Sequence, residues 1–193
     1  MNSIHEYKEK NNIMIMSKKF ILTAIIALMP TLFFGQAAFD KYDGQDDVTS
    51  VIVNKKMFQM MGNVKNKETQ QYLNLIKKLD NLKVFTTTST RVTADMKGTA
   101  EKYIKSAGLE ELMRVNDKTQ NIKIMVKSGA GETQVRELLM FIEGTGKNET
   151  VLMSLTGDFD LNEISMLTDR MNLPGGDDLK KAGKGTKGPK VVK

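Results

Sequence analysis

The spacing of apolar residues follows a helical period in the first half of the chain and a strand-like period after Gly108. A clear helical series is Tyr72, Leu75, Ile76 and Leu79, which is the i, i+3, i+4, i+7 pattern of an amphipathic helix. Runs rich in β-branched residues interrupt the helical segments and predict strands. The first half is therefore expected to hold strands at 48–53 and 82–88 and helices at 54–61, 66–79 and 90–107.

Four short runs of strand-forming residues follow Gly108, and the turn-prone segments between them are short enough for hairpins. They predict an antiparallel meander with strands at 110–116, 120–127, 134–143 and 149–156. A last helix is expected from Asp160, with Glu163 three residues later as in a capping box, and Pro174 ends it. The pattern thus predicts one α+β domain over residues 38–174, in which helices pack on one face of a mainly antiparallel sheet with a C-terminal four-strand meander.

The third run of the meander, residues 134–143, carries apolar residues at consecutive positions rather than at alternate ones. Such a run is typical of a central strand with both faces covered. We expect some of these side chains to form an apolar patch on the sheet face opposite the main core, and such a patch marks a partner or ligand surface. The predicted members of this face are Met125, Leu138, Met140, Ile142 and Leu152.

The N-terminal segment has the order of a secretory signal peptide. Lys18 and Lys19 precede an uncharged run of 15 residues, 20–34, and small residues follow it. The run is shorter than the roughly 20 residues that span a bilayer, so no stable membrane anchor is expected. We predict a signal peptide over residues 1–37, cleaved after Ala37, with Met16 as an alternative start, and hence a periplasmic or secreted protein. No cysteine ends the run, so lipid attachment has no acceptor.

The net charge of +6 is concentrated at the two ends of the chain. Residues 1–38 hold four lysines and two glutamates, which gives +2, and residues 175–193 hold six lysines and two aspartates, which gives +4. The part between them is neutral, so it offers no basic footprint for nucleic acid. Residues 175–193 are rich in glycine and lysine without apolar periodicity, and we expect a disordered tail that makes at most weak contact with anionic surfaces.

The residue inventory restricts the chemistry that the chain could perform. It contains no cysteine and no tryptophan, and its one histidine, His5, lies in the predicted signal peptide. The mature chain would then lack histidine triads and Cys/His zinc sites. Asp158, Asp160 and Asn162 open like a calcium loop, but Glu163 stands where that loop needs glycine, so a helix cap explains them. We therefore assign no catalytic, cofactor-binding or metal-binding residue.

The same residues carry a family resemblance. The run NIKIMVKSGAGETQVRELLMFIEG, followed by ETVLMSLTGDFDLNEISML, resembles the exported Bacteroidota proteins grouped as domain of unknown function 4252, over residues 39–170. The most specific part is the segment from Leu155 to Leu161. The resemblance implies export and a small α+β domain, and it implies no activity, no cofactor and no catalytic residue.

The leading functional hypothesis is a non-enzymatic cell-envelope protein that binds an unknown envelope protein, or itself, through the apolar sheet face. The alternative is a carrier for a small ligand or a lipid, in which the same residues would line a closed pocket. A carboxylate-based hydrolase comes third, because a pair of carboxylates would have to converge in a cleft.

Overall fold

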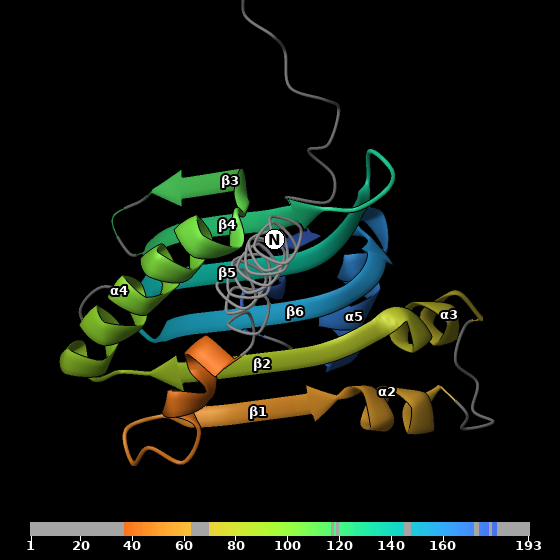
Figure 1. The fold of residues 1–193 in the computed structure, drawn as a ribbon. Coiled ribbons are helices and arrows are strands. Elements are labelled where there is room, and N and C mark those ends of the chain that lie inside the picture. Colours follow the sequence, from red (N-terminus) through yellow and green to blue (C-terminus); the bar gives the residue numbers. More distant parts are fainter. Residues whose placement is uncertain are drawn as a thin grey trace, which may run out of the picture. The chain divides into compact units, whose positions relative to one another are not determined.

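Helices lie on both faces of a six-stranded antiparallel sheet in the computed structural model of this chain (Figure 1). The structure describes residues 37–62, 70–116, 118, 120–144, 148–171, 174–177 and 179–180. The chain divides into two units, 1–38 and 39–193, and the whole sheet belongs to the second. Apart from Ala37, the predicted signal peptide lies outside the described residues. No helix within the described ranges is long and apolar enough to cross a membrane.

The order of the strands across the sheet is β1-β2-β6-β5-β4-β3, and all neighbours are antiparallel. The strands are β1 (Thr49–Asn54), β2 (Leu79–Thr87), β3 (Glu110–Asn116), β4 (Gln120–Ser128), β5 (Gln134–Gly144) and β6 (Thr150–Asp160). The α+β class and the antiparallel sheet are thus confirmed. The sheet is larger than a four-strand meander, because β2 pairs with β6 and carries β1 at its outer side.

Some helix ends have recognisable capping chemistry. They are α2 (Lys55–Met61), α3 (Gln70–Lys78), α4 (Thr90–Ala107) and α5 (Ile164–Met171), with 3₁₀ turns at η2 (Ala37–Tyr42) and η3 (Leu161–Glu163). The Asn54 side chain accepts a hydrogen bond from the Met57 backbone N–H at 3.0 Å and so caps α2. Gly108 follows α4 with φ 66°, the left-handed conformation in which helices commonly end.

The main core fills the sheet face that α3 and α5 cover. Leu75 and Ile76 of α3 and Leu167 of α5 are fully buried there. Side chains along a strand point alternately to the two faces of the sheet, and directly opposed residues of antiparallel strands point to the same face. Each strand therefore contributes every second residue to this core. These are Val53, Leu82, Val84, Ile122, Ile124, Val126, Leu138, Met140, Ile142, Val151, Met153 and Leu155.

A second apolar layer lies on the opposite face, on the side of α4 and η2. Phe85, Leu139 and Leu152 are fully buried, and their strand positions alternate with those of the main core. The Tyr42 ring of η2 meets the Phe85 ring edge-on, with 5.7 Å between the centroids. The prediction that helices pack on one face only is therefore wrong. Because β5 is apolar on both sides, each side needs a covering layer.

The segment that carries the family resemblance extends β6 to Asp160, beyond the predicted end of that strand at residue 156. Gly157 lies where β6 passes the end of α3 and the start of β2. A Cβ atom at Gly157 would lie 2.4 Å from the Lys78 carbonyl oxygen and 2.8 Å from the Leu79 Cα. Only glycine permits this approach, which explains why a glycine stands between Thr156 and Asp158.

The first residues of the predicted tail pack against the fold. Leu179 is fully buried and belongs to the main core, and its backbone N–H donates to the Gly175 carbonyl oxygen at 3.2 Å. The composition of residues 175–193 concealed this apolar anchor among lysines and glycines. Residues 181–193, which hold the remaining part of the predicted tail, lie outside the described residues.

Candidate functional site

The structure splits the predicted partner face between the two sides of the sheet. That face was predicted to consist of Met125, Leu138, Met140, Ile142 and Leu152. The three β5 members belong to the main core under α3 and α5, whereas Met125 and Leu152 lie on the α4 side. All five are at most 7% exposed. They therefore form no common surface. The side to which a residue of β4, β5 or β6 points depends on how these strands are aligned with one another, and the alignment includes register shifts. The apolar pattern of the sequence does not specify that alignment.

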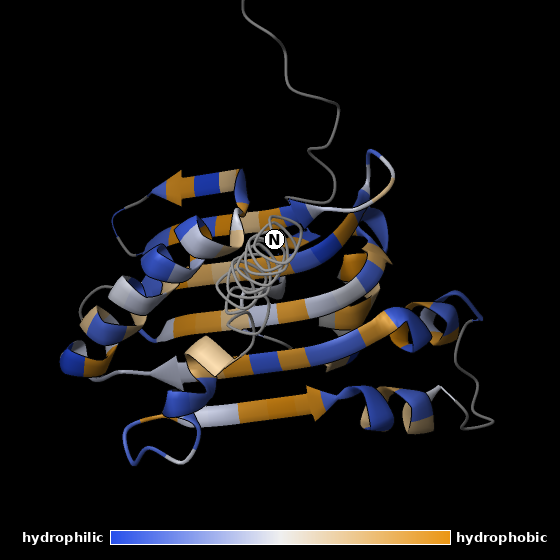
Figure 2. Ribbon diagram, in the orientation of Figure 1, coloured by the Kyte–Doolittle hydropathy of each residue, from blue (hydrophilic) through white to orange (hydrophobic). Residues whose placement is uncertain are grey.

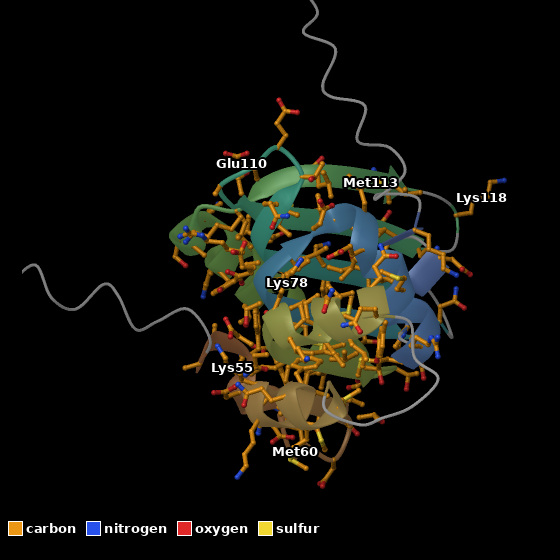
Figure 3. The ribbon with its side chains drawn as sticks, turned by 90° about the vertical axis from the view of Figure 1, so that its right-hand side faces the viewer. Lys55, Met60, Lys78, Glu110, Met113 and Lys118 are labelled. Atoms are coloured by element: carbon orange, nitrogen blue, oxygen red, sulfur yellow. The ribbon has the colours of Figure 1, made fainter. Side chains whose placement is uncertain are left out.

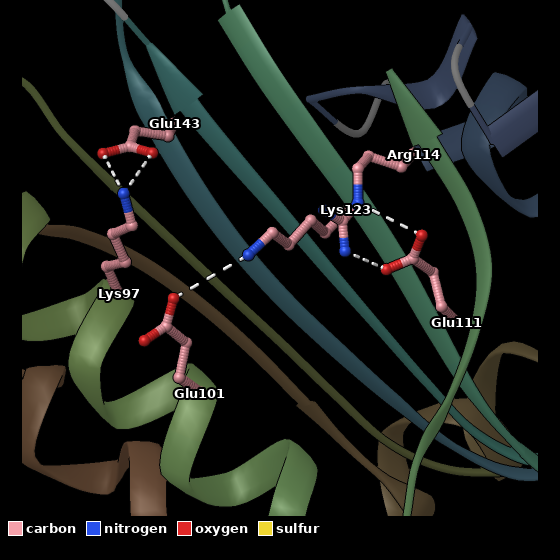
Figure 4. Close-up of polar contacts among 6 residues, drawn as sticks. All are labelled: Lys97, Glu101, Glu111, Arg114, Lys123 and Glu143. Atoms are coloured by element: carbon pink, nitrogen blue, oxygen red, sulfur yellow. Dashed lines mark hydrogen bonds and ion pairs between the residues drawn. The ribbon is translucent and has the colours of Figure 1, made fainter. Parts of the chain in front are cut away.

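Charged pairs join α4 to the sheet on the α4 side (Figure 4). The Lys97 Nζ lies 2.9 and 3.0 Å from the two carboxylate oxygens of Glu143 at the end of β5. The Lys123 Nζ of β4 lies 3.7 Å from the Glu101 carboxylate. Such partly exposed pairs stabilise a fold only weakly, so their main effect is to fix where α4 crosses the sheet.

A buried hydrogen bond between Tyr103 and Glu137 makes a third link between α4 and the sheet. The Tyr103 hydroxyl donates to the Glu137 carboxylate at 2.6 Å. Burial raises the pKa of Glu137, although the Tyr103 hydrogen bond and the charge of Lys127 act in the opposite direction. Burial, and next the Glu137 carboxylate, raise the pKa of Tyr103.

A buried carboxyl group with a raised pKa is the kind of group that a hydrolase would use. A second carboxylate on this side of β5, Glu143, is six residues further along the strand. At about 3.3 Å per residue the two are about 20 Å apart. Carboxylate pairs in glycosidases stand about 5–10 Å apart. Glu137 and Glu143 therefore do not form such a pair, and both are used to hold α4.

β1 forms an edge of the sheet and offers its outer side to another strand. In the described part of the chain it pairs with β2 alone, over six consecutive residue pairs without irregularity. Its sequence, TSVIVN, holds four β-branched residues and no charge, proline or glycine. Val51 and Ile52 point to opposite faces and are 45% and 43% exposed. Figure 2 shows the apolar half of β1 leading toward α2. An edge of this kind is a template for strand pairing.

The opposite edge of the sheet, β3, is protected by charge and by a bulge. Glu110, Glu111 and Arg114 are exposed along it, and the Arg114 guanidinium forms an ion pair with the Glu111 carboxylate (Figure 4). The register of β3 against β4 shifts between Glu111 and Met113. Charges and bulges are the features by which proteins prevent an edge strand from pairing. The β1 edge therefore lacks the charges and the bulge that protect the β3 edge.

α2 continues the exposed apolar surface beyond the end of β1. Met57 and Met60 are 49% and 57% exposed on one side of the helix, while Phe58 on the other side is fully buried. Figure 3 shows Met60 and Lys55 at one end of the view and Glu110 and Met113 of β3 at the other. Among the described residues, the exposed large hydrophobic side chains all fall in this segment: Val51, Ile52, Met57 and Met60. We call residues 49–61 the β1–α2 edge.

Asp160, the centre of the calcium-like sequence, is a helix cap. Its carboxylate accepts hydrogen bonds from the Thr133 hydroxyl at 2.7 Å and from the Asn162 backbone N–H at 2.8 Å. Burial opposes ionisation, but these hydrogen bonds outweigh it and lower the pKa of Asp160. Within the described ranges no three acidic or histidine side chains are grouped so that they could hold a metal ion. The prediction of a cap at Asp160 is confirmed.

Sequence reasoning missed the β1–α2 edge. It assigned residues 48–53 to a strand and 54–61 to a helix, but it did not show that this strand lies at the edge of the sheet. One signal was available: an uncharged β-branched run stands between Asp46-Asp47 and Lys55-Lys56. Only the strand order shows that this uncharged run lies at an exposed edge of the sheet.

Comparison with known proteins places the chain in a family. Residues 42–167 match the family described as Domain of unknown function (DUF4252), and the chain belongs to it. The matched range extends from the end of η2 to α5 and so includes the whole sheet. No curated protein and no solved structure matches the chain.

Proposed function

We propose that this chain is an exported, non-enzymatic cell-envelope protein that binds another protein chain by adding a strand at β1. The observation that carries the proposal is the gathering of exposed apolar side chains on one edge of the sheet, the β1–α2 edge. Strand addition combines backbone hydrogen bonds with side-chain contacts on both faces of the new strand. Val51 supplies such a contact on one face and Ile52 on the other.

The flanking helix supports the same binding mode. Methionine side chains are flexible and polarisable, and they adapt to partners of different shape. Met57 and Met60 stand beside the end of β1 and would contact residues of a partner that extend past the strand. The buried residues of the two sheet faces hold the edge in place, and under this proposal they are not themselves the binding surface.

Export is supported by the lysine pair and apolar run of residues 18–34 and by the resemblance to exported Bacteroidota proteins. Mass spectrometry of the protein from fractionated cells tests it. We expect an N-terminus at Ala38 in the periplasmic or secreted fraction. Recovery of intact peptides that run through residues 28–34 would contradict export with cleavage.

Site-specific photocrosslinking in the producing cell tests the binding mode. A benzophenone amino acid would replace Ile52 on the β1 edge or Asn116 on the β3 edge, where both side chains are exposed. We expect covalent protein adducts from position 52 and none from position 116. The added substitution Val51→Lys should remove the adducts, since a charge on an edge strand opposes pairing.

The matched control is Asn116→Lys, which adds the same charge at the other edge and should leave the adducts at position 52 unchanged. Circular dichroism should show that both lysine variants keep the fold, because neither side chain is buried. Absence of adducts at position 52, or equal adducts at both positions, would refute strand addition at β1.

A further inference from the structure

We infer that the strand added at β1 is β1 of a second copy of this chain, paired antiparallel about a two-fold axis that passes between the two Val51 residues. This inference rests on the proposed function and names its partner. A two-fold pairing uses the same surface on both copies and closes after two chains, so it covers the open edge without building a filament.

The charges at the two ends of β1 are complementary in an antiparallel self-pair. Asp46 and Asp47 stand before the strand, separated from it by Val48, and Lys55 and Lys56 follow directly after it at the start of α2. All four are exposed, and the strand between them is uncharged. Antiparallel pairing of two copies places the acidic end of each copy beside the basic end of the other. Parallel pairing would instead bring like charges together.

Symmetry and charge together select one register. A two-fold axis perpendicular to the sheet keeps each residue on its own face, so two opposed residues must have numbers whose sum is even. The sum 102 places Val51 opposite Val51 and Thr49 opposite Val53. The turn with Asp46 and Asp47 before one β1 then lies nearest the first turn of the other copy's α2, where Lys55 and Lys56 stand. The sums 100 and 104 offset these two charged segments by two residues. The charges therefore favour the register centred on Val51.

The ion pairs that these side chains already make do not prevent this pairing. Lys55 lies 2.7 Å from the Asp80 carboxylate, and Asp47 lies 3.8 Å from the Arg91 guanidinium. All four side chains are about half exposed or more. Exposed pairs of this kind contribute little and rearrange readily. The flanking charges remain available to a second copy.

A cysteine scan tests the register, because the chain has no cysteine of its own. Opposed residues in an antiparallel pair have Cα atoms about 4.5–5.5 Å apart, which suits a disulfide. Under mild oxidation, V51C should give a disulfide-linked dimer. I52C should give little, because the two Ile52 side chains are diagonal neighbours about 7–8 Å apart in this register. Efficient linkage of I52C with none of V51C would overturn the register.

Charge exchange tests the identity of the partner. One variant, D46K/D47K, carries only lysines at both ends of β1, and the other, K55E/K56E, carries only acidic residues. Each should self-associate about tenfold or more weakly than the unaltered chain, whereas an equal mixture should recover heterodimers. Sedimentation over a range of concentrations measures the self-association of each variant and of their equal mixture. The proteins are used in the form to which the producing cell processes them. The control E111K/R114E exchanges charges on β3 and should leave dimerisation unchanged.

Failure of this inference can be separated from failure of the proposed function. If the chain stays monomeric at every concentration, V51C forms no disulfide and the mixed variants do not associate, self-pairing is refuted. Adducts from position 52 to a different protein would then leave strand addition standing. Absence of adducts at position 52 as well would refute both proposals.

Discussion

Substitution of Gly157 by alanine should be among the most damaging single-methyl additions in this protein. The new Cβ would stand 2.4 Å from the Lys78 carbonyl oxygen and 2.8 Å from the Leu79 Cα. Both atoms belong to the backbone, so a strand has to move. The φ of 156° is also one that side chains other than glycine rarely adopt. Overpacking and backbone strain each cost about 1–3 kcal/mol, so we expect a loss of about 2–6 kcal/mol.

Urea unfolding followed by circular dichroism measures this loss, since the chain lacks tryptophan. A small domain has a stability of about 5–15 kcal/mol, so the expected change is a substantial part of it. Gly98→Ala provides the matched control. Gly98 lies inside α4 with no atom from the rest of the fold within 4 Å of the place that a methyl group would take, and alanine there should stabilise by about 0.5–1 kcal/mol. Equal effects of the two substitutions would refute the close-approach argument.

Three further predictions concern the buried Glu137, the helix cap Asp160 and the buried Leu179. Glu137→Gln should gain stability relative to the unaltered protein as pH rises above about 4.5, because the raised pKa makes ionisation of Glu137 costly in the fold; pH-dependent urea unfolding checks this. Asp160→Ala should lose about 1 kcal/mol at neutral pH, and the loss should shrink below about pH 3.8, because the lowered pKa stabilises the fold only while Asp160 is ionised. The same titration measures it, and a loss independent of pH would contradict the capping role. Leu179→Ala should lower the free energy of unfolding by about 2–3 kcal/mol, since Leu179 is fully buried, and no change in the thermal midpoint would place it outside the core.

Local pattern predicted the elements well because most of them carry their own signals. The strand at 110–116 has the predicted bounds, and α4 begins at Thr90 and is followed by Gly108 as expected. The β-branched run at 48–53 corresponds to β1 with a shift of one residue. In each case propensity, capping and turn chemistry agree over a short stretch of chain.

Long-range pairing explains what the pattern did not predict. Nothing local shows that β2 pairs with β6, and that pairing alone makes β1 an edge. The β5 residues Leu138 and Leu139 are equally apolar, so their sequence does not say which one faces α3 and α5 and which one faces α4. The β1–α2 edge depends on the β2–β6 pairing, so it was visible only once the strand order was known. The predicted partner face depended instead on which side each β5 residue faces, which the pairing of β5 with its neighbours decides.

The two-sided apolar character of β5 also bears on how the chain avoids an incorrect arrangement. A slip of β5 by one residue would exchange its faces and still bury large apolar side chains on each side: Leu139 and Phe141 on one, and Leu138, Met140 and Ile142 on the other. The same slip would carry Glu137 and Glu143 into the layer beneath α3 and α5, away from Tyr103 and Lys97. Desolvated carboxylates without donors would make that alternative costly. The Tyr103–Glu137 hydrogen bond and the Lys97–Glu143 ion pair thus favour the observed register of β5 over the shifted one.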